Sequence, residues 1–283
     1  MAKRLLGTEV NEALVASLQT RAAALKEKGV TPTLAILRLG ENPSDLSYEK
    51  GATKRAEEIG VAIKNFILPE SATKEEVLAV IDEVNADASV HGVLMFRPLP
   101  KHLKADQDEI CNRLAPCKDV DSMTHMSNAG VFESQDLGYA PCTPAACMEI
   151  LDHYGIDCKG KNAVVIGRSL VVGKPAAMML MEKNATVTIC HTKTVNTAEV
   201  CKKADIIVTA AGVLNSLTAD YVREGQIVID VGINVTAEGK IVGDVDKAAA
   251  EAKTAAYSPV PGGVGAVTTS VLMKHVVEAA ERA

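Results

Sequence analysis

The turn after the apolar segment Ala163–Ile166 carries residues that could bind an anion. Gly167, Arg168 and Ser169 form this turn, and Gly173 lies where apolar residues begin to recur at helical spacing. A strand, a glycine turn and a helix direct backbone N–H groups at whatever lies above the strand, which favours a dinucleotide pyrophosphate. The glycines do not match the G-x-G-x-x-G spacing. An ordinary α/β crossover with a tight turn is the alternative, and the glycines alone do not decide.

The next apolar segment, Ala185–Cys190, ends without an acidic residue. An acid at this place in a dinucleotide-binding unit accepts a hydrogen bond from the ribose 2′-hydroxyl of NAD. Here Thr192 and Lys193 follow the segment, and Arg168 lies in the earlier turn. Hydroxyl and cationic groups suit a 2′-phosphate, so we expect NADP, with NAD as the alternative. The alternative is that Lys193 and Arg168 are surface charges hydrated by solvent and have no binding role.

The segments that must position these residues alternate between strand and helix patterns. Apolar strands separated by helices are typical of a parallel sheet covered on both faces, so the sequence predicts an α/β fold. In the first half the expected strands are 33–39, 61–68 and 90–96, the helices 11–28, 45–59, 73–85 and 108–114, and the loop 115–127. In the second half we expect helices 143–154, 171–181 and 267–280, further strands 204–210 and 226–231, and a hairpin within 234–243.

A glycine-dense loop, Pro259–Gly265, precedes the expected last helix. Prolines restrict such a loop, and glycines let a ligand approach its backbone closely. A binding role is the expectation, and a structural crossover between domains is the alternative.

Composition limits the class of protein. The chain has 283 residues, enough for two domains, with 47% hydrophobic residues, a net charge of −6 and a pI of about 5.6. Its acidity argues against nucleic-acid binding as the main function, and no apolar run reaches the length of a membrane span. No signal-peptide h-region is evident. Seven cysteines without C-x-x-C spacing indicate core thiols in a reducing cytoplasm, with no disulfide framework or metal site.

Several motifs together resemble the methylenetetrahydrofolate dehydrogenase/cyclohydrolase family from roughly Leu6 to the C-terminus. These motifs are Gly167-Arg168-Ser169 with Val172-Gly173, the Pro259–Gly265 loop, Pro141-Cys142-Thr143-Pro144, Lys118-Asp119-Val120-Asp121, and Tyr48 after Asn42-Pro43. The resemblance implies two α/β domains with a cleft between them, the second Rossmann-like. It implies a folate-site domain, 1–140 completed by 266–283, and an NADP-binding domain, 141–265. It also implies a homodimer acting in one-carbon metabolism and purine biosynthesis.

The resemblance assigns roles residue by residue. Tyr48 and Asp121 match the catalytic tyrosine and the aspartate that hydrogen-bonds the pterin. The other expected substrate-binding residues are Ala52, Met95, Phe96, Arg97, Pro261, Gly262, Gly263, Val264 and Gly265. The expected cofactor-binding residues are Gly167, Arg168, Ser169, Thr192 and Ile233. The implied reactions are hydride transfer from 5,10-methylenetetrahydrofolate to NADP, then hydrolysis of 5,10-methenyltetrahydrofolate to 10-formyltetrahydrofolate.

The chain departs from the family motif at two partner positions. Ala52 stands where the family has a lysine four residues after the tyrosine, and Phe96 stands where it has the glutamine that orients this lysine. Lys50 and Lys54 lie roughly 160° and 120° around the helix from Tyr48. Hydride transfer depends on placement, whereas hydrolysis needs proton shuttling. We therefore predict a dehydrogenase with weak or absent cyclohydrolase activity.

Three other hypotheses stay open. One is the ordinary bifunctional enzyme, with Lys54 or Arg97 recruited by a shifted backbone. Another is a non-catalytic folate- or nucleotide-binding paralogue. The third is a dehydrogenase that uses another one-carbon carrier. Further departures from the motif are Asp45 for serine, Ser122 for glycine and Ala266 for proline.

Overall fold

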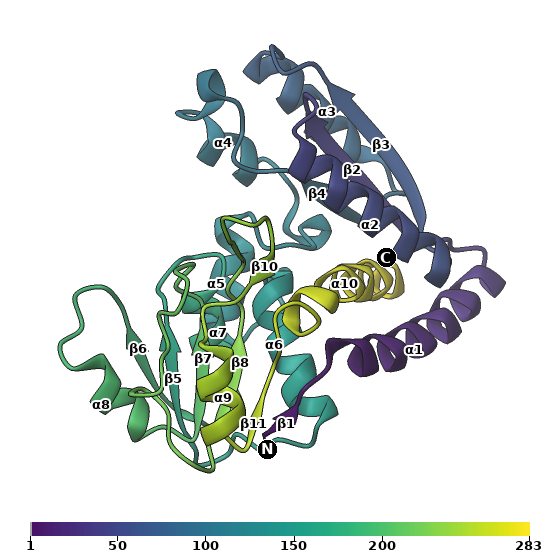
Figure 1. The fold of residues 1–283 in the computed structure, drawn as a ribbon. Helices are drawn as coiled ribbons and strands as arrows, with labels where there is room; N and C mark the ends of the chain where they lie inside the picture. The colour runs from purple at the N-terminus through teal and green to yellow at the C-terminus, as the bar shows by residue number, and fades with distance from the viewer. Residues whose placement is uncertain (1) are drawn as a thin grey trace. The chain divides into compact units, whose positions relative to one another are not determined.

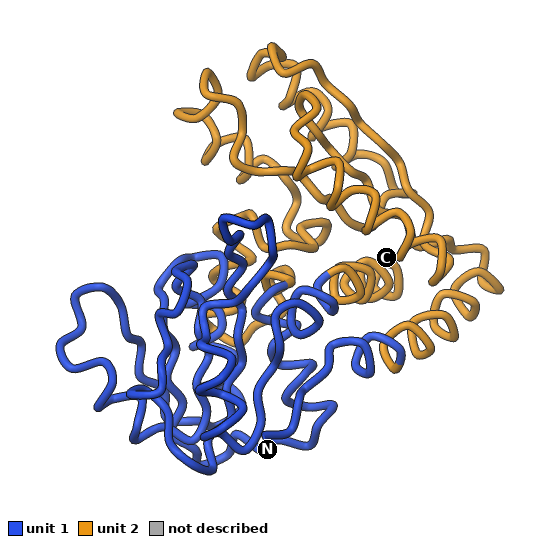
Figure 2. The backbone as a smooth tube through the Cα atoms, viewed as in Figure 1, with its two compact units in different colours: residues 1–12, 143–268 blue, residues 13–142, 269–283 orange. Residues whose placement is uncertain are grey.

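The computed structural model describes residues 2–283, which fall into two compact units (Figure 2). Unit 1 contains residues up to Glu12 together with Thr143–Thr268, and unit 2 contains Ala13–Cys142 with Thr269–Ala283. Each unit is an α/β structure with its own parallel sheet, which confirms the predicted fold class. Among the described residues, no helix is both long and apolar enough to cross a bilayer.

Unit 1 is built on a six-stranded parallel sheet in the order β1-β11-β8-β7-β5-β6 (Figure 1). The strands are β1 (Lys3–Arg4), β5 (Asn162–Ile166), β6 (Thr186–Cys190), β7 (Ile206–Thr209), β8 (Ile227–Asp230) and β11 (Ala256–Tyr257). The chain leaves β5 for the edge strand β6 and then returns past β5 to β7. This reversal is a topological switch point, where ligands of open α/β sheets bind at the carboxyl ends of the strands.

The other elements of unit 1 are short. They are nearly all of α6 (Cys142–His153), α7 (Gly173–Glu182), α8 (Thr197–Lys202), α9 (Lys247–Lys253), the 3₁₀ turn Val264–Ala266, and the antiparallel hairpin β9 (Asn234–Val235) and β10 (Ile241–Val242). The predicted hairpin is therefore confirmed. A buried apolar core packs against strands β5 to β8 and includes Val164, Ile207 and Val228.

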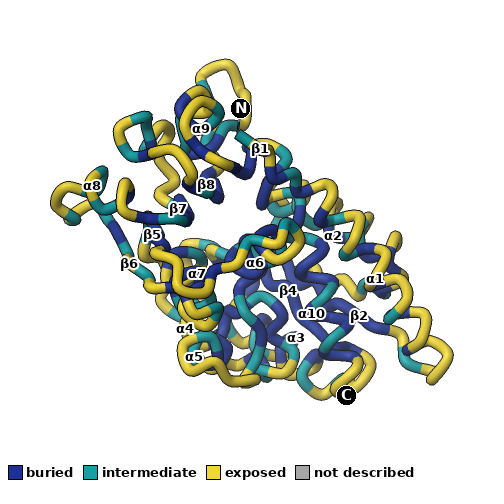
Figure 3. The backbone as a smooth tube through the Cα atoms, turned by 90° about the horizontal axis from the view of Figure 1, so that it is seen from below, coloured by how far each residue is buried: buried dark blue, intermediate teal, exposed yellow. Residues whose placement is uncertain are grey.

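Unit 2 has a three-stranded parallel sheet in the order β3-β2-β4. Its strands are β2 (Thr33–Leu39), β3 (Ala62–Leu68) and β4 (Gly92–Met95). Its helices are most of α1 (Gly7–Glu27), α2 (Pro43–Ile59), α3 (Lys74–Ala86), α4 (Gln107–Asn112), α5 (His125–Glu133) and nearly all of α10 (Thr268–Arg282), with 3₁₀ turns at Lys101–Leu103 and Pro116–Lys118. Strand β2 is buried along its whole length, and α10 buries most of its residues (Figure 3). These two elements therefore form the centre of unit 2.

Local sequence signals explain where the helices of unit 2 begin and end. The Asn42 side chain accepts a hydrogen bond from the Ser44 N–H and Pro43 occupies the first turn of α2, which ends at Gly60 in the left-handed conformation, φ 93°. The predicted capping box of α3 is confirmed, because Thr73 and Glu76 each bond the other's backbone N–H.

The structure differs from the prediction where elements are short. Strand β1 pairs with β11, so the first residues belong to unit 1 and not to the folate-site domain to which the sequence assigned them. The expected loop 115–127 already contains the start of α5, capped by the Thr124 side chain. Six of the seven cysteines are buried as expected, and Cys117 is exposed. A strand of two residues, such as β1, is too short to show the alternation of apolar and polar side chains from which strands are predicted.

Candidate active site

The glycine turn of unit 1 is as tight as the sequence predicted. Gly167 has φ 131°, in the region that favours glycine, and the Ser169 Oγ accepts from the Val172 N–H at 3.1 Å. A Cβ atom on Gly173 would lie 2.3 Å from the Gly167 carbonyl oxygen. Any side chain at residue 173 would therefore force the backbone of the turn apart. The two glycines let β5 pass directly into α7.

The same turn offers unused hydrogen-bond donors. Across the residues that the structure describes, the backbone N–H groups of residues 168–171 donate to no other protein atom, whereas Gly167 and Lys174 bond Cys190 and Ser169. These N–H groups lie at the carboxyl end of β5 and the N-terminus of α7, where a positive partial charge favours an anion. Arg168 is exposed beside them. The residues present therefore fit a dinucleotide phosphate.

Exposed apolar side chains surround the carboxyl ends of the strands in unit 1. They follow β5, β6, β7 and β8 in turn, and they are Leu170, Val171, Val195, Val213, Leu214 and Ile233. Thr192 and Lys193 are also exposed, in a turn where the His191 Nδ1 accepts from the Lys193 N–H. Ile233 is 69% exposed. Apolar surface of this kind suits the flat rings of a dinucleotide.

Two buried carboxylates hold the loops at this edge of the sheet. The Asp244 carboxylate accepts from the N–H groups of Ala211, Gly212 and Val213, at 2.7, 3.0 and 3.0 Å. Asp230 accepts from the N–H groups of residues 232, 244 and 245, and burial raises the pKa of Asp230 to about 6. The sequence does not reveal this pair, because the two acids become neighbours only when β8 and the segment after β10 fold together.

The predicted folate loop, Pro261–Gly265, belongs to unit 1. Gly262 has φ 98° and its carbonyl accepts from the Gly7 N–H at 2.8 Å, which fixes the loop to the start of α1. Gly263 and Val264 are buried, while Pro261 and Gly265 are exposed. Only the exposed part of the loop can contact a ligand, and the buried part holds it in shape.

Tyr48 and Phe96 are brought together in unit 2. Tyr48 lies on α2 and Phe96 follows β4, and their rings meet edge to face at 6.0 Å with an angle of 84°. Ala52 is completely buried and Met95 is 4% exposed, so both serve as packing residues in this state. Lys50 and Lys54 are exposed. The place of the family lysine is thus filled by a methyl group.

Arg97 and Asp121 form the polar part of this cluster. The Arg97 Nη2 lies 4.0 Å from the Asp121 Oδ2, and the two side chains are 25% and 32% exposed. The other oxygen of Asp121 accepts from the Cys142 N–H at 3.2 Å. The carboxylate is therefore fixed on one side and open on the other.

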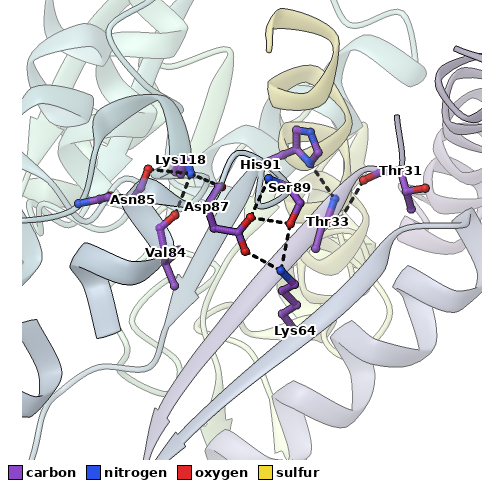
Figure 4. Close-up of polar contacts among 9 residues, drawn as sticks. All are labelled: Thr31, Thr33, Lys64, Val84, Asn85, Asp87, Ser89, His91 and Lys118. Carbon is purple, nitrogen blue, oxygen red and sulfur yellow. Dashed lines mark hydrogen bonds and ion pairs between the residues drawn. The ribbon is translucent and has the colours of Figure 1, made fainter. Parts of the chain in front are cut away.

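The residues before Asp121 anchor it to the core of unit 2. Figure 4 shows the Lys118 Nζ donating to the carbonyls of Val84, Asn85 and Asp87, at 2.7, 3.1 and 2.7 Å, where α3 ends. Burial lowers the pKa of Lys118. The buried Asp119 carboxylate accepts from the N–H groups of residues 123 and 124 and from the Ser127 hydroxyl. Lys118 and Asp119 thus stabilise the local backbone. Of the three charged residues, Asp121 is the one whose carboxylate is available to a ligand.

A Rossmann-like unit with an open glycine turn, and a second α/β unit with an aromatic and charged cluster, define a two-unit dinucleotide-binding enzyme. Two family models match the chain: the tetrahydrofolate dehydrogenase/cyclohydrolase catalytic domain at residues 5–121, and the NAD(P)-binding domain of the same family at residues 141–283. The chain belongs to this tetrahydrofolate dehydrogenase/cyclohydrolase family of enzymes.

Individual relatives cover almost the whole chain. The bifunctional protein FolD of Alkaliphilus oremlandii is 47% identical over 279 residues, covering 99% of this chain and 97% of the relative. The crystal structure of the bifunctional FolD of Campylobacter jejuni is 40% identical, with a TM-score of 0.95 over 100% and 99% of the two chains. The Trypanosoma brucei enzyme, solved with NADP and an inhibitor, is 30% identical, with a TM-score of 0.91 over 99% and 98%. These names favour the alternative hypothesis of an ordinary bifunctional enzyme over the predicted loss of hydrolysis.

Proposed function

We propose that this chain oxidises 5,10-methylenetetrahydrofolate with NADP and hydrolyses the 5,10-methenyltetrahydrofolate that results. The observation that carries the proposal is the cluster of Tyr48, Phe96, Arg97 and Asp121 in one unit of a chain whose relatives are named bifunctional. In the first step a hydride leaves the one-carbon bridge for the nicotinamide. In the second, water adds to the methenyl carbon, a proton is released, and the ring opens to 10-formyltetrahydrofolate.

Binding and placement account for the first step. Asp121 would accept hydrogen bonds from the pterin, Tyr48 would lie beside the one-carbon bridge, and the exposed part of Pro261–Gly265 would follow the folate. Gly167 and Ser169 would hold the pyrophosphate, Arg168 would lie beside the 2′-phosphate, and Thr192 and Ile233 would lie at the adenosine and nicotinamide ends. Such placement lowers the barrier by removing translational and rotational freedom before the reaction. NADP supplies the hydride acceptor when it is bound.

NADP is proposed over NAD because cationic and hydroxyl groups follow β6. Arg168, Thr192 and Lys193 are exposed, and no acid stands beside them to accept from a free 2′-hydroxyl. The structure of the Trypanosoma brucei relative with NADP agrees with this choice. Replacing Arg168 by alanine should lower kcat/KM for NADP and leave kcat/KM for NAD unchanged. Equal losses with the two cofactors would show that Arg168 does not contact the 2′-phosphate.

A specific observation favours a second candidate, a dehydrogenase with little hydrolysis. Ala52 is completely buried and apolar, and Phe96 contacts Tyr48 where the family has a glutamine. No amine therefore stands beside Tyr48 at either position to move a proton, and general acid–base groups typically supply about 10²–10⁴-fold in rate. This candidate keeps the same substrate, cofactor and first step.

One paired assay separates the candidates. The purified enzyme is given methylenetetrahydrofolate with NADP, and in parallel methenyltetrahydrofolate alone, whose loss of absorbance is compared with the uncatalysed rate. We expect acceleration in both assays. NADP reduction without accelerated hydrolysis would overturn the bifunctional proposal and support the second candidate. Absence of NADP reduction would overturn both and support a binding paralogue.

Restoring the family residues sharpens the result. The double variant Ala52→Lys with Phe96→Gln places an amine on the buried face of α2, where burial lowers the pKa of a lysine toward the range useful for proton transfer. If the wild type hydrolyses poorly, this variant should gain hydrolysis, whereas Lys54→Ala on the exposed face should change nothing. A homodimer, a cytoplasmic location and a role in purine biosynthesis are further parts of the proposal that come from the family resemblance.

A further inference from the structure

Arg97 is a charged residue with no counterpart in the family motif, which has leucine at this position after the glutamine. It lies two residues after the end of β4, next to Phe96, and its side chain is only 25% exposed. Its nearest charge is Asp121, at 4.0 Å, which is too long for a hydrogen bond. Among the described residues 2–283, no protein atom accepts a hydrogen bond from the Arg97 guanidinium. A partly buried arginine with unused N–H groups is costly unless a ligand accepts from them.

The two side chains place an acceptor next to a donor. Asp121 offers a carboxylate oxygen, since its other oxygen is occupied by the Cys142 N–H. Arg97 offers several N–H donors in the plane of its guanidinium group, which stays protonated. The pterin ring of a folate presents the complementary edge: its 2-amino group and N3–H donate, and its C4 carbonyl accepts. Within that edge, the lactam N–H nitrogen and carbonyl oxygen lie about 2.2 Å apart by amide geometry.

We propose that Arg97 donates a hydrogen bond to the C4 oxygen of the pterin while Asp121 accepts from N3–H and the 2-amino group. Hydrogen bonds that diverge from two neighbouring atoms reach protein partners roughly 3–4 Å apart, which agrees with the 4.0 Å between the Arg97 Nη2 and the Asp121 Oδ2. Arg97 is thus a specificity-determining residue that selects 4-oxo pterins. This inference rests on the proposed folate site, and it concerns binding and not the hydride or proton steps.

The test changes one atom of the substrate and one side chain of the enzyme. Wild type, Arg97→Leu and Arg97→Lys are assayed for NADP reduction with 5,10-methylenetetrahydrofolate and with its 4-amino-4-deoxy counterpart, in which the C4 acceptor becomes a donor. A 4-amino pteridine is also more basic, so the informative quantity is the change in the ratio of kcat/KM values between enzymes. Lys101→Leu, which removes an exposed cation in the same unit, is the matched control.

We expect Arg97→Leu to raise the KM for the 4-oxo substrate by about 10- to 100-fold, the loss typical of one charge-assisted hydrogen bond. The kcat should change little, because the bond is present in both ground and transition states. The preference for 4-oxo over 4-amino should fall by a similar factor, and Arg97→Lys should restore part of it. Lys101→Leu should behave as wild type.

Two results would overturn the inference. An unchanged 4-oxo to 4-amino ratio in Arg97→Leu, with the KM raised equally for both substrates, would mean that Arg97 only supports Asp121 or the local fold. An unchanged KM for the 4-oxo substrate would mean that Arg97 is a solvated charge. Failure of the proposed function is a separate outcome, since the wild type would then reduce NADP with neither substrate.

Discussion

The candidate binding regions of the two units differ in what forms them. The glycine turn of unit 1 is a local structure, in which Gly167, Ser169 and Gly173 shape a backbone whose N–H groups are the proposed donors to the nucleotide. The proposed folate site of unit 2 is an assembly of side chains from separate elements, with Tyr48 on α2 and Asp121 in the loop after α4. A backbone site depends on a few glycines and tolerates other changes. A side-chain site can change its chemistry one residue at a time, as Ala52, Phe96 and Arg97 illustrate.

The largest expected effect comes from a side chain added to the turn. In Gly173→Ala the Cβ would lie 2.3 Å from the Gly167 carbonyl oxygen, so the turn must open. We expect a loss of about 3 kcal/mol in stability and at least a roughly 100-fold rise in the KM for NADP, because the backbone donors move. Thermal unfolding and cofactor kinetics measure the two effects.

Gly51→Ala is the matched control for that substitution. Gly51 lies inside α2 with no atom within 4 Å of an added Cβ, so alanine should stabilise the helix by about 0.5–1 kcal/mol. A Gly173→Ala variant with normal NADP kinetics would break the comparison, since the turn would then not need its close backbone contact.

The second prediction separates two aspartates of one motif. Asp119→Asn turns an amide N–H₂ toward the N–H groups of residues 123 and 124, and we expect it to destabilise the protein by about 2–3 kcal/mol. Asp121→Asn keeps the oxygen that accepts from Cys142, so stability should change by less than about 0.5 kcal/mol. Its KM for the folate substrate should rise at least roughly 10-fold. Equal destabilisation by the two substitutions would show that Asp121 is also an anchor.

Opposite pH dependences are expected in the two units. In unit 1, burial raises the pKa of Asp230 to about 6, above the 3.8 of an ordinary aspartate. Between these values the folded state holds a proton that the unfolded state releases, so the Asp230 contribution to stability falls as pH rises from about 4 to 6. In unit 2, burial lowers the pKa of His91, whose Nδ1 accepts from the Thr33 N–H (Figure 4). Its contribution is instead lost as pH falls below 6.5.

Hydrogen exchange can follow the units separately. Between pH 6 and 4, after correction for the intrinsic exchange rate, amides of β8 should gain protection relative to those of β2, by on the order of 1–2 kcal/mol. Asp230→Asn should flatten this difference, whatever its effect on overall stability. If the slope survives in Asp230→Asn, another group in unit 1 is responsible.

The sequence predicted best what is local. The bounds of β2, the capping box at Thr73 and the turn at Gly167 depend on residues close together in the chain, and all three are confirmed. It could not predict β1, because two residues become a strand only by pairing with β11. The hydrogen bond between Asp230 and Asp244 could not be predicted either, because the two residues lie on separate elements that meet only in the folded chain. In the proposed folate site the residue types could be read from the sequence, but only the fold shows that Arg97 lies 4.0 Å from Asp121.

The smallest expected effect concerns Ser122, which replaces the family glycine after Asp121. It has φ 53°, where glycine is preferred, and its buried hydroxyl has no hydrogen-bond partner among the described residues. Ser122→Gly should relieve the strain and remove the unsatisfied hydroxyl, and even after the greater unfolded-state entropy of glycine we expect a gain of about 1 kcal/mol. Ser134→Gly is the control, since Ser134 has the same φ of 53° and an exposed side chain, so it reports the backbone part alone. A gain in both variants by the same amount would assign the whole effect to the backbone. A raised KM for folate in Ser122→Gly alone would instead place the hydroxyl against the ligand and extend the side-chain site by one residue.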